Sequence, residues 1–484
     1  MTDKIIVRKY NDVYIHLDCE RGVLYEIAQY FTFQVPGYQF MPSFQDGMWD
    51  GKIRLVNLNT QLLYAGLLSY VEKFCRDRDY EVVIHDSIQQ AEQFSVEEAK
   101  DFVLSLDLPM VPHEHQMKAF VTAVRNRRRL ILSPTASGKS LIIYLLVRFY
   151  EEKSLIVVPT IQLVHQMYGD FKEYSNGTWG PDECHLITGG KEKTSDKPVL
   201  ISTWQSIYKQ RKNYFDPFRL VIGDEAHGFK ATSLTSIMTK LINTPYRVGL
   251  TGTLDETETH QLVLEGLFGP VKKVISTAEL MEKDLLSQFE IKCIVLKHKT
   301  EDAKALRKKK YHEEIDYLIS HDKRNKFIRN LAVSLEGNTI VLFRMVEKHG
   351  KVLYDLIKEK VDGKRKVFYV HGGTDAEARE EVRRIVERET DAIIVSSSVF
   401  STGTNIVNLH NAIFASPSKG RIRNLQSIGR ILRKTKDGNQ ATLYDIADDL
   451  IIGQHKNFTI KHFAARVKIY NEEKFNYTLY RVKI

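Results

Sequence analysis

Short apolar runs, many of them β-branched, alternate with helix-length stretches from residue 116 onward. A first series of runs comprises Leu130–Leu132, Leu155–Val158, Val199–Ile201, Leu220–Ile222 and Val248–Leu250. A second series comprises Ile291–Leu296, Thr339–Phe343, Val367–Val370, Ile393–Val395, Ala412–Ala415 and Thr442–Tyr444. Strands of a parallel sheet are apolar along their length because helices cover both faces. The pattern therefore predicts two α/β domains in tandem.

The first 85 residues follow a mixed pattern. Strand-like pieces at Lys4–Lys9, Val13–Leu17, Lys52–Leu55 and Glu81–Ile84 are interrupted by helical pieces at Leu24–Phe31 and Leu67–Arg78. This predicts a small α+β N-terminal domain over residues 1–85. We expect a connector with some helix over 86–110, the two α/β domains over 111–285 and 286–453, and a C-terminal helix and strand over 454–484 that pack on the second domain.

Composition and charge limit the class of protein. The 484 residues are 43% hydrophobic and 27% charged, which is ordinary for a soluble protein. No apolar run is long enough to span a membrane, and residues 1–20 are charged and polar, so we expect a cytoplasmic protein with no membrane partner. The four cysteines have no C-x-x-C spacing, which argues against a zinc knuckle. The net charge of +9 favours a polyanionic partner such as nucleic acid.

The stretch "SPTASGKS", residues 133–140, is nearly a phosphate-binding loop of the pattern G-x-x-x-x-G-K-[ST], with Ser133 in place of the first glycine. A strand-like run precedes it and a helix-length run follows, which is the geometry that places a phosphate at a helix N-terminus. We expect Lys139 to reach the β- and γ-phosphates of ATP and Ser140 to hold Mg²⁺. The residues expected to bind ATP here are Thr135, Ala136, Ser137, Gly138, Lys139 and Ser140.

The stretch "LVIGDEAHGF" carries a D-E-A-H sequence at the end of an apolar strand. Asp224 can hold the water shell of Mg²⁺, and Glu225 can orient or deprotonate the attacking water. His227 completes this candidate catalytic group. An acidic strand-to-helix turn is the alternative for a lone D-E pair, but the phosphate loop upstream favours catalysis.

The stretch "QSIGRILRK" places Arg430 and Arg433 three residues apart, on one face of a helix. Two guanidinium groups suit the γ-phosphate charge of a transition state. We expect them, with Gln426, to act from the second domain on the site in the first. A basic surface helix is the alternative.

These elements together resemble the motifs of superfamily 2 helicases and translocases with a DEAH-type motif, and further stretches match that family in order. Gln116 resembles the glutamine that reads adenine. The stretches "VVPTIQLVHQ", "STWQS", "IVLFRM" and "VFSTGTNI" resemble strand-binding or domain-coupling motifs, and "GLTGT" resembles the motif that couples the domains. The resemblance implies DNA contacts by Pro159, Thr160, Gln166, Thr203, Arg344 and Thr402, coupling by Thr251 and Thr253, and a nucleotide contact by Gly403. It also implies an α/β fold of two tandem RecA-like parallel-sheet motor domains.

Most of the chain resembles the UvsW-like family of phage recombination helicases, through residues 31–57, 126–140 and 472–484 among others. The family couples ATP hydrolysis to 3′→5′ unwinding, branch migration of Holliday junctions, fork regression and R-loop removal. The resemblance implies ATP and Mg²⁺ as cofactors. The implied partners are branched double-stranded DNA, single-stranded DNA, RNA–DNA hybrids and single-stranded-DNA-binding or recombination proteins. A phage-encoded chain is expected in the host bacterial cytoplasm.

Other functions and roles stay open at this point. The motor motifs also fit an RNA helicase or a duplex translocase that does not separate strands. A DNA-binding scaffold with an inactive motor is a third hypothesis, against which the intact D-E-A-H and arginine pair argue. The aromatic residues Tyr38, Phe40, Phe44 and Trp49 could stack on bases, but a domain core is favoured. The basic residues 304–312 could contact duplex arms, but a solvated helix face is favoured.

Overall fold

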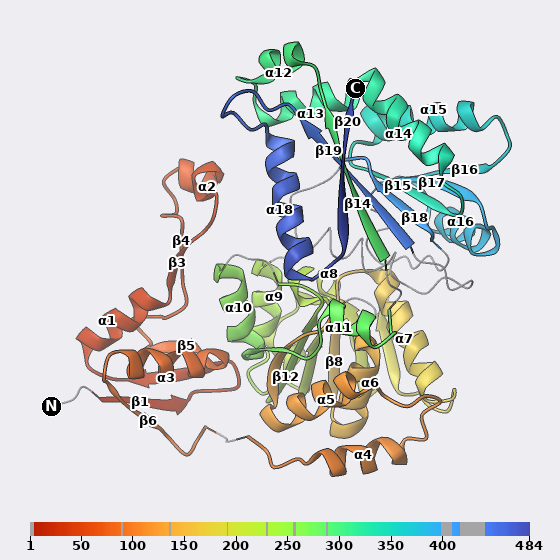
Figure 1. Ribbon diagram of the computed structural model, residues 1–484. Coiled ribbons are helices and arrows are strands. Elements are labelled where there is room, and N and C mark those ends of the chain that lie inside the picture. The colour runs from red at the N-terminus through yellow and green to blue at the C-terminus, as the bar shows by residue number, and fades with distance from the viewer. Residues whose placement is uncertain are drawn as a thin grey trace. The chain divides into compact units, whose positions relative to one another are not determined.

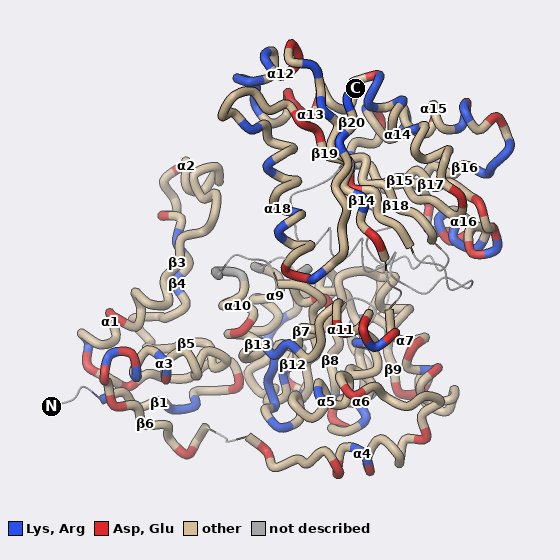
Figure 2. Tube along the Cα trace, in the orientation of Figure 1, with Lys and Arg blue, Asp and Glu red and all other residues tan. Residues whose placement is uncertain are grey.

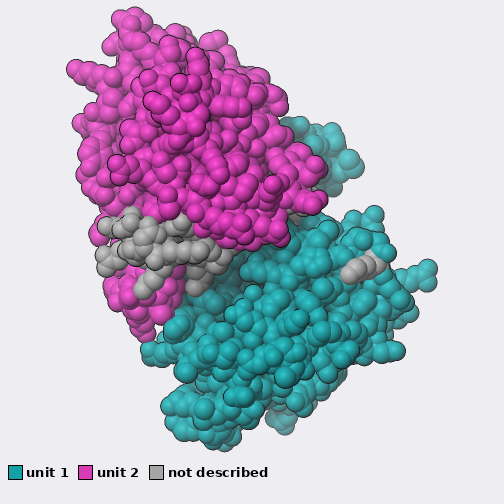
Figure 3. Space-filling model, turned by 90° about the vertical axis from the view of Figure 1, so that its right-hand side faces the viewer, with its two compact units in different colours: residues 1–275 teal, residues 276–484 magenta. Residues whose placement is uncertain are grey.

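The computed structural model describes residues 4–88, 91–134, 137–190, 192–228, 231–254, 258–286, 289–397, 409–416 and 441–484. The chain divides into two compact units, residues 1–275 and residues 276–484 (Figure 3). Each unit is described below by itself.

A four-stranded sheet forms the centre of the N-terminal domain (Figure 1). Its strands are β1 (Lys4–Lys9), β2 (Tyr14–Asp18), β5 (Leu62–Tyr64) and β6 (Glu81–Ile84), in the order β5-β2-β1-β6. Strands β1 and β6 are parallel, and the other neighbours are antiparallel. Helices α1 (Arg21–Tyr30) and α3 (Leu68–Asp77) bury apolar side chains in this domain. The expected α+β N-terminal domain is therefore confirmed.

A two-stranded arm extends from this domain. Strands β3 (Thr32–Gln34) and β4 (Lys52–Arg54) pair antiparallel, and the tip holds α2 (Pro42–Gln45) (Figure 1). None of the arm residues Tyr38, Phe40, Phe44 and Trp49 is buried, and Phe40 is 81% exposed. The rings of Tyr38 and Phe44 touch each other, with centroids 4.6 Å apart. The expectation that these aromatics fill a core is wrong, because the arm is too thin to bury them.

Seven parallel strands form the sheet of the first α/β domain. They are β7 (Arg128–Leu132), β8 (Ser154–Val158), β9 (Cys184–Ile187), β10 (Val199–Thr203), β11 (Leu220–Gly223), β12 (Tyr246–Thr251) and β13 (Val271–Lys273), in the order β13-β7-β12-β11-β8-β10-β9. One group of helices on the sheet comprises α5 (Glu114–Asn126), α6 (Lys139–Tyr150) and α7 (Ile161–Tyr174). A second group comprises α8 (Trp204–Ile207), α9 (Ala231–Met238) and α10 (Glu258–Phe268) (Figure 1). Helix α4 (Val96–Ser105) lies in the expected connector and packs on α5.

The second unit contains another parallel sheet of seven strands. They are β14 (Phe289–Lys297), β15 (Thr339–Phe343), β16 (Lys366–Val370), β17 (Ala392–Ser397), β18 (Asn411–Phe414), β19 (Ala441–Asp449) and β20 (Tyr477–Lys483), in the order β16-β17-β15-β18-β19-β14-β20. Its helices are α11 (Thr277–Glu282), α12 (Thr300–Leu306), α13 (Tyr311–Ser320), α14 (Asp322–Ser334), α15 (Val352–Val361), α16 (Ala376–Arg388) and α18 (Phe458–Glu472). The helix and strand that the tail pattern predicts are α18, which packs on β19, and β20, which pairs with β14. Two parallel-sheet domains are therefore confirmed.

The basic stretch 304–312 spans the end of α12 and the start of α13. Figure 2 shows acidic residues among the basic ones on these two helices. Lys309 is exposed and forms an ion pair with Glu313, 2.9 Å away. These contacts agree with a solvated helix face.

The N-terminal domain and the first α/β domain share one hydrophobic core, in which Leu63 and Leu67 join Leu264 and Phe268 of α10. Gly66 lies directly against the backbone of α10. A Cβ atom at this position would stand 2.0 Å from the carbonyl oxygen of Glu265. Glycine is required here because a side chain would push the two domains apart.

Gly66→Ala is therefore expected to lower the free energy of unfolding by about 1–3 kcal/mol, the usual cost of overpacking. Chemical denaturation of the full chain measures this. Gly22→Ala on α1 is the matched control, because nothing lies within 4 Å of a Cβ at that position. Equal stability of the two variants would contradict the close docking at Gly66.

Candidate functional site

The phosphate loop follows the carboxyl end of β7, as the sequence predicts, and α6 begins at Lys139. Ser133, in place of the usual first glycine, is fully buried. Its hydroxyl donates a 2.6 Å hydrogen bond to Ser137 Oγ, which donates in turn to the carbonyl oxygen of Pro134 at 2.7 Å. The serine therefore braces the loop from inside.

The D-E-A-H sequence follows the carboxyl end of β11. In the sheet, β12 lies between β11 and β7. Lys139 Nζ lies 3.3 Å from Glu225 Oε1. Burial, and then the charge of Glu225, raise the pKa of the Asp224 carboxyl. Burial also raises the pKa of Glu225, but Lys139 and His227 outweigh it and hold that pKa below its usual value. Two carboxyl groups beside one lysine thus differ in proton affinity, as in sites that divide acid and base roles.

The backbone at Glu225 is in the left-handed region, with φ of 49°. A non-glycine residue in this region carries strain, which the surrounding contacts must hold. Glu225 N donates a 2.9 Å hydrogen bond to Asp224 Oδ1, and Asp224 N donates to the carbonyl oxygen of Val157 on β8. These bonds fix the Asp224 carboxylate and the backbone of both residues at the carboxyl ends of the strands.

His227 connects this acidic pair to the next strand. Its Nδ1 lies 2.5 Å from Thr251 Oγ1 and 3.5 Å from Glu225 Oε2. Because Thr251 Oγ1 donates its own hydrogen to the carbonyl oxygen of Thr253, it accepts the hydrogen of His227. The structure thus brings together the predicted residues Glu225, His227, Thr251 and Thr253.

Gln116 and its neighbour His115 hold the loop from α5. Gln116 Nε2 donates to the carbonyl oxygen of Ser137 at 3.1 Å, and His115 Nε2 lies 2.9 Å from the same atom. The backbone φ at position 138 is 75°, which requires Gly138, and a Cβ there would also displace the Gln116 amide, whose Nε2 would stand 2.2 Å away. The contact of His115 was not predicted, because no local pattern marks it.

Ser140 was expected to hold Mg²⁺, and its Oγ lies 2.8 Å from the hydroxyl oxygen of Tyr174, at the end of α7. Sequence reasoning missed Tyr174 as well, since 34 residues separate the two.

The residues predicted to contact DNA in the first domain lie on two adjacent strand ends. Pro159 and Thr160 follow β8, and Thr203 ends β10, with Val158 and Thr203 paired across the strands. Gln205 donates to the carbonyl oxygen of Pro159, and Thr160 caps α7. Gln166, in the second turn of α7, is exposed. In the second unit, the exposed Arg344 follows β15, and its Nη1 lies 3.4 Å from the hydroxyl of Tyr311.

Seven predicted site residues lie outside the described residues: Thr135, Ala136, Thr402, Gly403, Gln426, Arg430 and Arg433.

Comparison with known proteins identifies the family to which this chain belongs. Residues 4–85 match the family model "DNA helicase UvsW, N-terminal", residues 108–256 match "Type III restriction enzyme, res subunit", and residues 322–435 match "Helicase conserved C-terminal domain". The ATP-dependent DNA helicase uvsW of Enterobacteria phage T4 is 36% identical over 498 residues, covering 97% of this chain and 98% of the relative. The chain belongs to the UvsW family of DNA helicases. It is thus an ATP-dependent superfamily 2 helicase, as its motifs predict.

Two further similarities agree with membership of the UvsW family. The crystal structure of T4 UvsW matches with a TM-score of 0.53 and 34% identity, covering 99% of each chain. The DNA 3′-5′ translocase XPB2 of Sulfurisphaera tokodaii is 25% identical over 395 residues, covering 72% of this chain and 86% of the relative.

Among the described residues, no helix is long and apolar enough to cross a membrane.

The brace inside the phosphate loop of this UvsW-family chain leads to a prediction. Ser133 is not among the residues with positive φ, so its backbone does not require glycine. We expect Ser133→Gly to lose about 1 kcal/mol of stability with the hydrogen bond, and to bind ATP no more tightly. Thermal unfolding and titration with a fluorescent ATP analogue measure both, with Ser133→Ala separating the hydroxyl from backbone freedom. Tighter ATP binding by the glycine variant would show that the serine impairs the loop.

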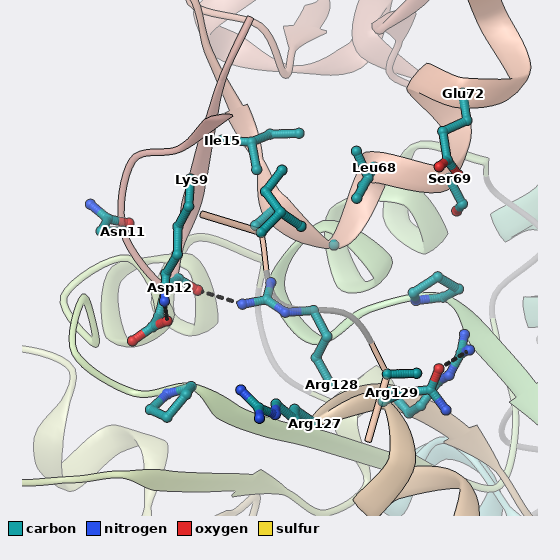
Figure 4. A pocket seen from close by; sticks show the side chains of 17 residues that line it. Lys9, Asn11, Asp12, Ile15, Leu68, Ser69, Glu72, Arg127, Arg128 and Arg129 are labelled. Carbon is teal, nitrogen blue, oxygen red and sulfur yellow. Dashed lines mark hydrogen bonds and ion pairs between the residues drawn. The ribbon is translucent and has the colours of Figure 1, made fainter. Parts of the chain in front are cut away.

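A pocket of about 260 Å³ lies near the amino end of β7, whereas the phosphate loop follows the carboxyl end of the same strand (Figure 4). Arg128, at the start of β7, extends into it and donates a 2.7 Å hydrogen bond to the carbonyl oxygen of Asp12. Lys9 forms an ion pair with the Asp12 carboxylate at 2.6 Å. The pocket joins the N-terminal domain to the first α/β domain, and none of the predicted ATP residues lines it.

Proposed function

We propose that this helicase uses Mg²⁺-dependent ATP hydrolysis to unwind and branch-migrate branched DNA, such as Holliday junctions, stalled forks and R-loops, with 3′→5′ polarity. The observation that carries the proposal is the meeting of Lys139, Glu225 and His227 at the carboxyl ends of β7 and β11. Ligands of open α/β sheets bind at this edge. The family and the strand-end positions of Thr160 and Thr203 support nucleic acid as the substrate.

The residues present fit a magnesium ion. Ser140 offers a hydroxyl oxygen and Asp224 a buried carboxylate, and hard oxygen ligands suit Mg²⁺. Burial beside the charge of Glu225 raises the pKa of Asp224, so the site favours a neutralising cation. When bound, Mg²⁺ supplies charge neutralisation for the ATP phosphates.

We assign roles to this chain's residues on that basis. Lys139 binds the β- and γ-phosphates, and Glu225 orients the attacking water and takes its proton. His227 orients Glu225 and links it to Thr251 on β12, so that movement of one residue affects the other. From the sequence, Gln426, Arg430 and Arg433 stabilise γ-phosphate charge. Gln116 reads adenine, and Thr402 and Gly403 contact DNA and nucleotide.

The DNA contacts are expected to be independent of sequence. Hydroxyl and amide groups at Thr160, Gln166 and Thr203, with Arg344 in the second unit, suit phosphates, which position a strand without reading its bases. The exposed Phe40 at the tip of the arm offers a ring for base stacking at a fork. The name of XPB2 supports the polarity.

A duplex translocase that does not separate strands is the second candidate, favoured by the similarity to a protein named as a translocase. Stimulation of ATPase activity by forked DNA, linear duplex and single-stranded RNA discriminates among the candidates. The proposal expects the largest stimulation with forked DNA. Equal stimulation by linear duplex favours the translocase, and stimulation by RNA alone favours an RNA helicase.

A further inference from the structure

Helix α7 reaches the candidate magnesium site through Tyr174. The hydroxyl oxygen of this tyrosine lies 2.8 Å from Ser140 Oγ, a normal hydrogen-bond distance. The ring is half-buried and packs edge-on against Tyr144 of α6, with centroids 5.6 Å apart. Tyr144 is itself held by Phe171, at 5.4 Å, and by Trp179, at 5.7 Å. The aromatic packing therefore fixes where the Tyr174 hydroxyl stands.

A second residue of α7 acts on the same site. Burial and the charge of Glu225 are the main causes that raise the pKa of Asp224, and the charge of Asp170, one turn before Tyr174, adds a smaller contribution. The amino end of α7 is capped by Thr160, a predicted DNA contact. One helix therefore extends from a strand-binding motif to the two residues expected to hold the metal.

The chemistry of the two hydroxyl groups indicates which of them donates the hydrogen bond. A serine hydroxyl has one hydrogen and two lone pairs, so a serine that ligates a cation must give its hydrogen to another acceptor. The Tyr174 hydroxyl oxygen lies at hydrogen-bond distance from Ser140 Oγ, and a phenol oxygen can accept a hydrogen bond as well as donate one.

We propose that Tyr174 is a positioning residue for the ATP site: its hydroxyl oxygen accepts the hydrogen of Ser140 and turns a serine lone pair toward the magnesium ion. This rests on the proposed function of Ser140 as a magnesium ligand. In this role Tyr174 acts through Ser140 and not by direct contact with the ion or the nucleotide. Removing its oxygen leaves the serine hydroxyl free to rotate, so the ion binds a ligand that is no longer oriented.

The test measures metal binding without hydrolysis. Mn²⁺, which shares the oxygen preference of Mg²⁺, is titrated into the full chain with a non-hydrolysable ATP analogue, and free Mn²⁺ is followed by electron paramagnetic resonance. Tyr174→Phe keeps the ring and its packing. We expect about tenfold weaker Mn²⁺ binding, the usual loss when a partner of a metal ligand is removed, with unchanged DNA binding in the absence of nucleotide. Tyr168→Phe, on the same helix beside Gly180, is the matched control and is expected to bind Mn²⁺ like the native chain.

Ser140→Ala separates the two levels of the hypothesis. If Ser140→Ala weakens Mn²⁺ binding and Tyr174→Phe does not, the role of Tyr174 is overturned while the site stands. Tighter Mn²⁺ binding by Tyr174→Phe also overturns it, because the tyrosine then competes with the ion. If Ser140→Ala binds Mn²⁺ normally, the placement of the metal at Ser140 is wrong.

Discussion

We expect Lys139→Ala to lower ATP hydrolysis and DNA unwinding by about 100-fold or more, the usual cost of removing one preorganised charge from a transition state. The side chain is nearly enclosed and lies 3.3 Å from Glu225, with the carbonyl oxygens of Ser133 and Pro134 within 3.5 Å. Nothing else among the described residues of the loop can place a cation at the γ-phosphate. Steady-state ATPase and strand-separation assays measure the loss, and DNA binding without nucleotide is expected to stay largely intact.

Lys118→Ala is the matched control for this variant. Lys118 is exposed on α5, the helix whose Gln116 holds the phosphate loop, and it lies outside the site. We expect native activity from it. DNA-stimulated ATPase of Lys139→Ala at the native level would remove the phosphate loop from the mechanism.

Glu225→Gln is expected to lower the rate of hydrolysis by about 100-fold or more, within the usual range for a general base, while ATP still binds. Lys139 and His227 hold the pKa of this carboxyl below its usual value, so it is ionised at neutral pH and can accept a proton. The amide keeps the size but cannot accept one. Single-turnover hydrolysis and binding of a fluorescent ATP analogue separate the two effects.

The control for Glu225→Gln is Glu151→Gln. Glu151 has the same left-handed backbone, with φ of 49°, but is exposed at the end of α6. Glu151 and Glu225 therefore share the backbone conformation, but only Glu225 lies in the candidate ATP site. Hydrolysis at the native rate by Glu225→Gln would assign the base to another residue.

The local sequence pattern was sufficient to predict the two sheets, the phosphate loop with Lys139 and the acidic D-E-A-H sequence. The apolar ends of "RRRLIL" and "LVIG" are each followed at once by polar residues, and the carboxyl ends of parallel strands lie on the same side of a sheet. That rule brings Lys139 to within 3.3 Å of Glu225, although 86 positions separate them in the chain. The fold and the proximity of Lys139 to Glu225 thus follow from periodicity and motif order together.

Contacts that depend on side-chain packing were beyond the sequence. His115, Tyr174 and the brace at Ser133 have ordinary sequence surroundings, and their partners become neighbours only when the helices pack on the sheet. The aromatic arm shows the opposite failure. Aromatic density suggested a core at Tyr38 and Phe40, but a two-stranded arm has no second layer that could bury them.

Branch migration of a synthetic four-way junction by the native chain, with ATP or with a non-hydrolysable analogue, tests the central claim most directly. The arms carry heterologous ends, so that spontaneous migration is blocked, and Lys139→Ala serves as the inactive motor. The account predicts conversion of the junction to forked products by the native chain with ATP and Mg²⁺ only. Conversion with the analogue or by Lys139→Ala, or no conversion by a native chain that hydrolyses ATP, would contradict it.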